Sequence, residues 1–455
     1  MSRLTVFFVC LLIIAACKKS ADSPTPNSNN ITPPTPPSTP TPQAGVVWQK
    51  ALGGTSEEEL ISCAPTADGG CVMIGVSDSN DGDVSGNHGS SDVWVVKLNS
   101  SGDISWQKTL GGSKDDIGYS IIATSDGGYA ALGYTKSTDG DFGPGSQAND
   151  LNVELWVVKL NSAGSIMWQK TFTGSSGEFG RSIVETSDGN LVIVGHTYSN
   201  DGDFIHPTNG YSDVFIIKLN SSGGVIWKKI VGGSQIDQLY SIVATPDGGA
   251  ISVGFSKSND GDVSGNHGSY DFWVVKINNA GNISWQKSFG GLDIEAAASI
   301  ARTNDGGYIV CGDTRSNSGD VSGNRGETDG WIIKIDEQGA LQWQKTFGGT
   351  ETESFVSTVV NSQGQIVAAG TSRSKNGDIA QNNGGLDFWV VQLDANGNLL
   401  RKKNFGGSAD DIAMGFINSL DGNYIVMGRT SSNNGDVSGH HGGYADGWVV
   451  KFKFQ

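Results

Sequence analysis

An acidic residue recurs at one position in seven copies of a repeat that fills the chain after residue 45. Each acid follows the first residue of a Gly-rich turn by five positions and directly precedes a short apolar run. The seven acids are Glu58, Asp116, Glu178, Asp237, Glu295, Glu353 and Asp411. If the copies close into a ring, these carboxylates should encircle the mouth of a central channel. There they could bind a cation or a polyol, or supply the paired carboxylates of a glycan-active hydrolase or lyase.

A structural role is the other interpretation of these acids, and the pattern favours it. In six copies a Ser lies four residues after the acid, at Ser62, Ser120, Ser182, Ser241, Ser299 and Ser357. A repeated acid with a hydroxyl partner is typical of hydrogen bonds to loop amides and to a neighbouring repeat. A glycosidase also needs its two carboxylates in different environments, whereas these acids look alike in every copy. We therefore predict no catalytic residue and no cofactor.

A second acid recurs in a Gly-Asp pair within a long polar loop, at Asp83, Asp141, Asp203, Asp262, Asp320, Asp378 and Asp436. In the first copy, Asp81, Asp83, Ser85 and Asn87 place oxygens at alternate positions, as in a calcium loop, but the downstream bidentate Glu of an EF-hand is missing. Asp and Asn beside Gly are also ordinary turn residues. Turn formation is the expected role, and calcium is the alternative. The weak metal candidates are Asp81, Asp83, Asp262 and Asp436.

Other reactive side chains form no recognisable constellation. The six His are His88, His196, His206, His267, His440 and His441. Several of them recur in corresponding loops of different copies, which would hold them too far apart to ligate one metal ion. No Cys-His, Ser-His-Asp or H-E-x-x-H pattern is present.

The elements that must position these residues are short strands. Each copy contains four apolar runs separated by Gly-rich turns, which is typical of a β-propeller blade. In the second copy we expect strands over 119–124, 129–135, 155–161 and 165–172. A Trp in the fourth run recurs down the chain, with 58 positions from Trp285 to Trp343 and 58 more to Arg401, which replaces it in the last copy.

The ends of the repeat region are incomplete in complementary ways. Trp48 opens the region within a strand of the fourth type, while the chain stops just after a strand of the third type, 447–452. If 46–52 pairs beside 448–454, every blade has four strands and the ring has no exposed edge. We therefore predict an all-β, seven-bladed β-propeller of four antiparallel strands per blade, closed by the N-terminal strand. Tight turns should occupy one face and long loops the other.

The repeat resembles a known propeller family. Its unit G-G-S-x-x-D, S-I-x-x-T-x-D-G-G-Y-x-x-x-G and D-x-W-V-V-K-L-N resembles the seven-bladed SBBP β-propeller repeat of secreted bacterial proteins. The piece L-N-x-x-G-x-I-x-W-Q-K is also similar to the Trp-bearing strand of quinoprotein-like and outer-membrane-assembly propellers. The first resemblance implies a fold and no common reaction. The second implies a cofactor-stacking Trp, whereas the Trp residues here fall inside predicted strands.

The N-terminus has the pattern of a secretory signal that ends in a lipid attachment site. Arg3 precedes an apolar run over 4–16, which is too short to span a membrane. The sequence Ile14-Ala15-Ala16-Cys17 resembles a bacterial lipobox, which implies a diacylglycerol and palmitate on Cys17 and, in the absence of Asp after it, an outer-membrane location. We expect a signal over 1–16, a Pro/Ser/Thr-rich stalk over 17–44 and the propeller over 45–455.

Composition excludes one class of partner. The chain has 30 basic and 47 acidic residues, a net charge of −17, which repels nucleic acid and anionic lipid head groups. We expect a monomeric, non-enzymatic binding or scaffolding module for a protein or glycan at the cell surface, with membrane contact only through the lipid. The alternatives are a glycan-active hydrolase or lyase and a lectin-like sugar binder. Insertions over 143–151 and 204–210 break the symmetry, so we expect an asymmetric ligand to touch them.

Overall fold

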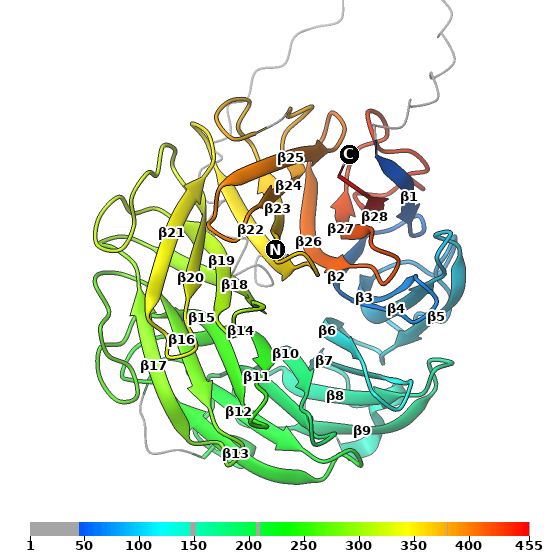
Figure 1. Ribbon diagram of the computed structural model, residues 1–455. Helices are drawn as coiled ribbons and strands as arrows, with labels where there is room; N and C mark the ends of the chain where they lie inside the picture. The colour runs from blue at the N-terminus through cyan, green and yellow to red at the C-terminus, as the bar shows by residue number, and fades with distance from the viewer. Residues whose placement is uncertain (1–44, 146–151, 206–209, 380, 455) are drawn as a thin grey trace, which may run out of the picture.

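The computed structural model is a ring of seven four-stranded antiparallel sheets around a central axis (Figure 1). It describes residues 45–145, 152–205, 210–379 and 381–454. The predicted signal, Cys17 and the stalk lie outside the described residues. In the described part, no helix is long and apolar enough to cross a membrane.

Each blade contributes an innermost strand and a second strand. The innermost strands are β2 (Glu58–Pro65), β6 (Asp116–Ala123), β10 (Glu178–Glu185), β14 (Asp237–Ala244), β18 (Glu295–Arg302), β22 (Glu353–Val360) and β26 (Asp411–Asn418). The second strands are β3 (Cys71–Ser77), β7 (Tyr129–Thr135), β11 (Leu191–Thr197), β15 (Ala250–Ser256), β19 (Tyr308–Thr314), β23 (Ile366–Ser372) and β27 (Tyr424–Thr430). The blades are numbered 1 to 7 in this order.

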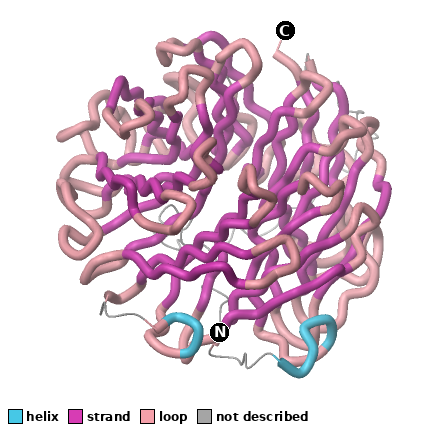
Figure 2. Tube along the Cα trace, turned by 60° about the horizontal axis from the view of Figure 1, so that its bottom comes forward, coloured by secondary structure: helices cyan, strands magenta, loops and turns pink. Residues whose placement is uncertain are grey.

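Two further strands complete each blade. The third strands are β4 (Asp92–Leu98), β8 (Glu154–Leu160), β12 (Asp213–Leu219), β16 (Asp271–Ile277), β20 (Asp329–Ile335), β24 (Asp387–Leu393) and β28 (Asp446–Phe452). The outermost strands are β5 (Ile104–Leu110), β9 (Ile166–Phe172), β13 (Val225–Val231), β17 (Ile283–Phe289), β21 (Leu341–Phe347), β25 (Leu399–Phe405) and, in blade 7, β1 (Val46–Leu52). Two 3-10 turns, η2 (Gly140–Gly145) and η3 (Gly202–Phe204), lie in the long loops of blades 2 and 3, at one edge of the molecule in Figure 2.

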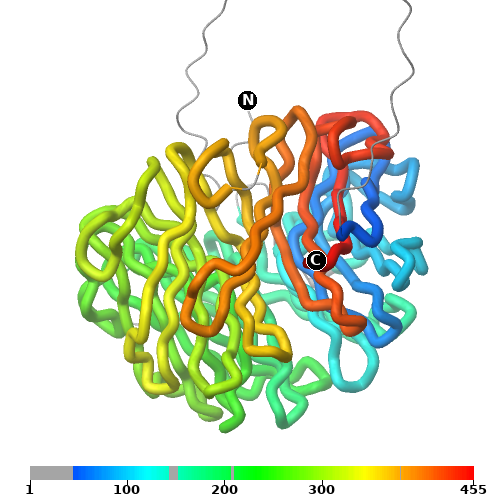
Figure 3. Tube along the Cα trace, turned by 45° about the horizontal axis from the view of Figure 1, so that its top comes forward, coloured from blue at the N-terminus to red at the C-terminus, as the bar shows by residue number. Residues whose placement is uncertain are grey.

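The ring is closed by its own ends, as the strand count predicts. Strand β1 pairs antiparallel with β28, from Val46 opposite Phe452 to Leu52 opposite Gly447. Figure 3 shows the blue N-terminal strand beside the red C-terminal one. Trp448 also donates a hydrogen bond from Nε1 to Gln49 Oε1 across this pair, at 2.8 Å. The final blade therefore has its four strands, and β28 is paired on both sides, by β27 and β1.

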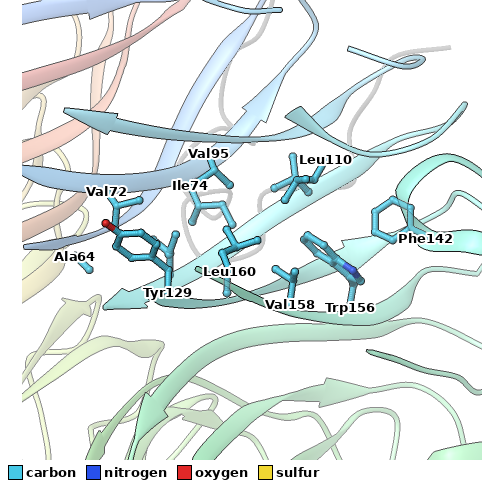
Figure 4. Packing of buried hydrophobic residues seen from close by; sticks show 13 residues of the cluster. Ala64, Val72, Ile74, Val95, Leu110, Tyr129, Phe142, Trp156, Val158 and Leu160 are labelled. Carbon is cyan, nitrogen blue, oxygen red and sulfur yellow. The ribbon is translucent and has the colours of Figure 1, made fainter. Parts of the chain in front are cut away.

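Apolar contacts between successive sheets form the core. In one such layer, Ile74 and Val95 of blade 1 face Trp156 and Leu160 of blade 2 (Figure 4). The second and third strands are buried along almost their whole length, which explains why their sequences are apolar on both faces. Each blade thus buries apolar surface against both of its neighbours.

The tight turns between first and second strands are fixed by an Asp. In blade 2, Asp126 Oδ1 accepts hydrogen bonds from Thr124 Oγ1 at 2.7 Å and from the Gly128 amide at 3.0 Å. The buried Lys159 of the third strand reaches the same carboxylate, at 2.8 Å. This lysine and the hydroxyl lower the pKa of Asp126 to about 2. The Lys of the repeated W-V-V-K motif is therefore part of the turn and not of a binding surface.

The recurring Trp of the outermost strand packs on the next blade. Trp227 of blade 3 lies against Gly281, in the turn between the third and fourth strands of blade 4, and donates a hydrogen bond to the Asn279 carbonyl at 3.0 Å. A Cβ on Gly281 would lie 2.9 Å from the indole, and Gly281 has φ of +77°. The same Trp-on-Gly contact recurs from Trp48 on Gly102 to Trp343 on Gly397.

This contact explains why the last copy has Arg401 in place of Trp. The residue at this position in blade 6 would pack on the turn between the third and fourth strands of blade 7. In blade 7 those strands are β28 and β1, which belong to opposite ends of the chain and have no turn between them. Arg401 instead donates a hydrogen bond to Gln392 of its own blade, at 2.9 Å.

We predict that Gly281→Ala destabilises the propeller more than Gly306→Ala. Both glycines have positive φ, which costs an L-residue about 1–2 kcal/mol, but a Cβ on Gly306 would meet nothing within 4 Å. Pressing a methyl group against the Trp227 ring should add roughly 1–3 kcal/mol. Urea unfolding of both variants measures the difference, and equal losses would show that the Trp-on-Gly contact contributes little.

Candidate functional site

The seven repeated acids begin the innermost strands, and their carboxylates bind the loop just before them. Asp116 Oδ2 accepts hydrogen bonds from the Gly112 amide at 2.9 Å and from Ser137 Oγ at 2.8 Å. Its Oδ1 accepts one from Thr135 Oγ1 at 2.6 Å. Burial is the largest influence on this carboxyl, outweighs these bonds, and raises its pKa to about 6. The same kind of cradle surrounds the acid of every blade.

Two details of the sequence interpretation are corrected here. All seven acids are fully buried, at 0 % exposure, so they form separate sites at the junctions between blades and not an open ring at the channel mouth. The hydroxyls that bind them come from the end of the second strand and the loop after it. The Ser four residues after the acid contacts the next blade instead: Ser62 Oγ accepts a hydrogen bond from the Ile121 amide at 3.4 Å, and Ser299 Oγ accepts one from the Thr358 amide at 3.2 Å.

A third repeated acid, which the sequence analysis did not single out, begins the third strand. Asp387 Oδ2 accepts a hydrogen bond from the Asn383 amide at 2.6 Å, while its buried Oδ1 has no partner among the described residues. Burial raises the pKa of Asp387 to about 7, and the Asp411 carboxylate of the next blade adds to the effect. This acid could have been found from the sequence, because it is the Asp that begins the repeated D-x-W-V-V-K motif.

At six of the seven junctions between blades, a glycine lies against one or both of the buried acids. A Cβ on Gly406 would lie 2.4 Å from Asp387 Oδ1 and 2.9 Å from Asp411 Oδ2. The first Gly of the Gly-Gly turn is therefore required by two carboxylates that approach from different blades. The junction between blades 2 and 3 departs from the pattern at both positions together, with Thr173 in the turn and Glu154 of blade 2 in place of Asp.

The acids of the Gly-Asp pairs also bind loop amides. Asp83 Oδ2 accepts a hydrogen bond from the Gly53 amide at 3.3 Å, and Asp262 and Asp436 repeat this contact with Gly232 and Gly406, each at 3.2 Å. Asp81 accepts hydrogen bonds from the Thr55 amide at 2.8 Å and from its hydroxyl at 2.7 Å. These contacts fit turn formation. In the described ranges, no three His, Cys, Asp or Glu side chains gather in a way that could hold a metal ion.

Three of the histidines orient the third-strand acids. His88 Nδ1 lies 2.8 Å from Asp92 Oδ2, and the pairs His267–Asp271 and His441–Asp446 repeat this contact at 2.7 and 2.9 Å. They belong to different blades, as expected. His206 lies outside the described residues, as do 146–151 and 206–209 of the two insertions.

A cavity of about 260 Å³ occupies the central axis, and the innermost strands line it. Each of these strands carries a β-bulge at the same place, for example between Gly180 and Ser182 of β10. The bulge residue faces the cavity and changes from blade to blade: Ile61, Tyr119, Arg181, Tyr240, Ala298, Val356 and Met414. The next residue is Ser in six blades. Bulges are common where a strand must re-aim one side chain, so this variable position is the candidate functional site.

We predict that the propeller loses stability as pH rises from about 5 to 8. Asp387, Asp116 and Glu178 have folded pKa values of about 7, 6 and 7, above the roughly 4 of an unfolded carboxyl. The folded state therefore binds more protons, and its advantage disappears as pH rises through these values. Chemical denaturation at several pH values measures the free energy of unfolding.

Asp387→Asn should reduce the loss of unfolding free energy over this pH range, by about 1.4 kcal/mol for each unit of pKa shift removed, because the amide does not titrate. The control is Asp394→Asn in the same blade. Asp394 lies half-buried in a surface turn, and turn hydrogen bonds lower its pKa, so its contribution lies below this pH window. A slope unchanged by Asp387→Asn would contradict the prediction.

Comparisons with known proteins add distant similarities. No protein-family model matches the chain. The chain is 24% identical over 271 residues to the regulatory protein FlaEY of Caulobacter vibrioides, a match covering 56% of this chain and 27% of that protein. Among solved structures, Sqt1 from Chaetomium thermophilum has 10% identity and a TM-score of 0.44, covering 90% of this chain and 100% of that one.

A protein of unknown function from Dyadobacter fermentans has 10% identity and a TM-score of 0.43, covering 90% of this chain and 99% of that one. The chain thus spans about a quarter of the curated relative it matches. The seven-bladed β-propeller fold itself rests on the strand topology of this chain.

Proposed function

We propose that this chain is a bacterial cell-envelope lipoprotein of the SBBP type whose propeller is a non-enzymatic binding or scaffolding module for a protein or glycan. The repeat motifs and the lipobox-like sequence ending at Cys17 support the family and the anchor. In this proposal the Pro-rich segment spaces the propeller from an outer-membrane lipid, and the propeller presents its axial cavity to a ligand.

The observation that carries the binding role is the contrast between the repeated acids and the bulge residues. The repeated acids are alike, buried and committed to hydrogen bonds within their loops. A pair of catalytic carboxylates needs access to substrate and unlike environments, and these acids have neither. The bulge residues, in contrast, are of six types in the seven blades and face a common cavity. Variation on a uniform scaffold is the pattern expected of a recognition surface.

A panel of envelope glycans and peptides should therefore raise the melting temperature of the propeller without being chemically changed. A ligand present at a concentration well above its Kd should raise the melting temperature by several degrees, and this rise should saturate with ligand concentration. Product formation, followed by chromatography, tests the enzymatic alternative: turnover abolished by Glu295→Gln would overturn the proposal. Stabilisation by no member of the panel would also count against it.

Lipid attachment is tested separately in the full chain. Cys17→Ser should abolish incorporation of labelled palmitate in a bacterial host and move the protein from the membrane to the soluble fraction. Cys63→Ser is the matched control, because Cys63 is part of strand β2 and lies within the propeller. Labelling that survives Cys17→Ser would show that Cys17 is not the anchor.

A further inference from the structure

The lining of the axial cavity is divided into two unlike halves. Blades 2 to 4 contribute Tyr119, Arg181 and Tyr240 at the bulge position, whereas blades 5 to 7 contribute the short or flexible apolar side chains Ala298, Val356 and Met414. The polar, aromatic half therefore faces an apolar one, and blade 1 adds Ile61 and Glu59, whose carboxylate is paired with Arg429 at 2.9 Å. A cavity of about 260 Å³ with this arrangement suits one small, asymmetric group and not a symmetric ion.

Arg181 is the centre of the aromatic half. Its guanidinium carbon lies 4.7 Å from the ring centroid of Tyr119, 5.3 Å from that of Tyr240 and 5.7 Å from that of Phe179. The rings hold the planar group in place by cation–π contact. Its Nε is buried and has no hydrogen-bond partner among the described residues.

No carboxylate in the described part of the chain forms an ion pair with Arg181. This is unusual in a chain with 17 more acidic than basic residues. Arg429, in the second strand of blade 7, shows the ordinary arrangement: it pairs with Glu59 at 2.9 Å and with Glu57 at 3.3 Å. A half-buried guanidinium that no acid neutralises is a site prepared for an external anion.

The aromatic surface continues beyond Arg181 toward the face that carries the long loops. Phe179 stacks on His196 with ring centroids 5.2 Å apart and an angle of 17° between the planes, and Tyr198 meets both rings edge-on. His196 is buried, and burial followed by the nearby Arg181 lowers its pKa well below the usual value. The ring is therefore neutral and adds apolar surface without competing for an anion.

The serines of the cavity wall add hydrogen-bond donors. Ser62, Ser241 and Ser299 each accept a hydrogen bond from a backbone amide of another blade, at 3.4, 3.4 and 3.2 Å. An hydroxyl that accepts in this way keeps its own proton to donate. Donors spaced around the wall suit a ligand with several oxygens, and aromatic faces attract the weakly positive C–H groups of a sugar ring.

We propose that the axial cavity binds a carboxylate-bearing sugar, a uronic acid residue of a glycan, with its carboxylate on Arg181 and its ring against Tyr119 and Tyr240. This inference rests on the proposed binding role and gives it a ligand class. A free peptide C-terminus offers the same carboxylate, but it lacks the ring and the hydroxyls that the aromatic residues and serines would contact.

Methyl glucuronide and methyl glucoside are the matched probes, since they differ only in the carboxylate at C6. Titration calorimetry should show that the wild-type propeller binds the glucuronide at least about tenfold more tightly than the glucoside, as charged hydrogen bonds imply. Arg181→Gln should remove that preference. Arg181→Lys should weaken glucuronide binding while keeping part of the preference, because lysine keeps the charge and loses the planar fork.

The control variant is Arg302→Gln, which removes the same charge from the exposed last residue of β18 and should leave glucuronide binding unchanged. Thermal unfolding without ligand establishes that each variant is folded. The inference is overturned if Arg181→Gln binds the glucuronide like the wild type, if the two sugars bind equally, or if an acetylated dipeptide with a free C-terminus binds in preference. If other ligands of the wider panel bind and the glucuronide does not, the uronic acid inference is wrong, but the proposed binding role is still supported.

Discussion

The burial of carboxylates between blades is the constraint on which the rest of the structure depends. A buried charge without a cation must be stabilised by protein dipoles or become neutral, and this fold does both. Asp116 accepts hydrogen bonds from a glycine amide and two hydroxyls, and burial still raises its pKa. The Gly-Gly turn, the hydroxyl residues after the second strand and the acid are thus one unit, which is why they repeat together.

The same unit joins each blade to its neighbour. The backbone amide of Glu295 donates a hydrogen bond to the Tyr270 carbonyl of the preceding blade at 2.7 Å, and a Cβ on Gly290 would lie 2.6 Å from Glu295 Oε2 and 2.7 Å from Asp271 Oδ1. The outer rim is joined differently, by a Trp that packs on a glycine of the next turn. A blade is therefore fastened near the axis by polar contacts and at the rim by an aromatic one. Only the junction from blade 6 to blade 7 lacks the rim contact, because strand β1 completes blade 7 and leaves no turn there for residue 401 to pack on.

The sequence predicted the ring because strand number and order are encoded locally. Alternating apolar runs, Asp-Gly turns and the incomplete copies at the two ends were enough to place β1 beside β28. The environment of the acids was not predictable in the same way. Both faces of an innermost strand pack on other blades. A residue at the start of that strand can therefore be buried between two sheets, although it is close along the chain to residues that line the channel. The prediction placed Glu58 near the start of an innermost strand, which is correct, but outside that strand and exposed, whereas it is the first residue of β2 and fully buried.

The channel lining was missed for a related reason. The β-bulge inserts an unpaired residue, which breaks the alternation used to assign side chains to faces. Tyr119, Arg181 and Tyr240 would have been found by comparing copies for the position that varies most and not for the position that is constant. In a repeat protein, a residue type that is the same in every copy is one that each blade needs in order to pack, as the seven buried acids show. A position such as the β-bulge, which has the same backbone geometry in every blade but a different side chain in most of them, is not constrained by packing and can serve recognition. The residues that recognise a ligand are therefore expected at the positions that vary between copies, around Arg181, with which no carboxylate of the described residues forms an ion pair.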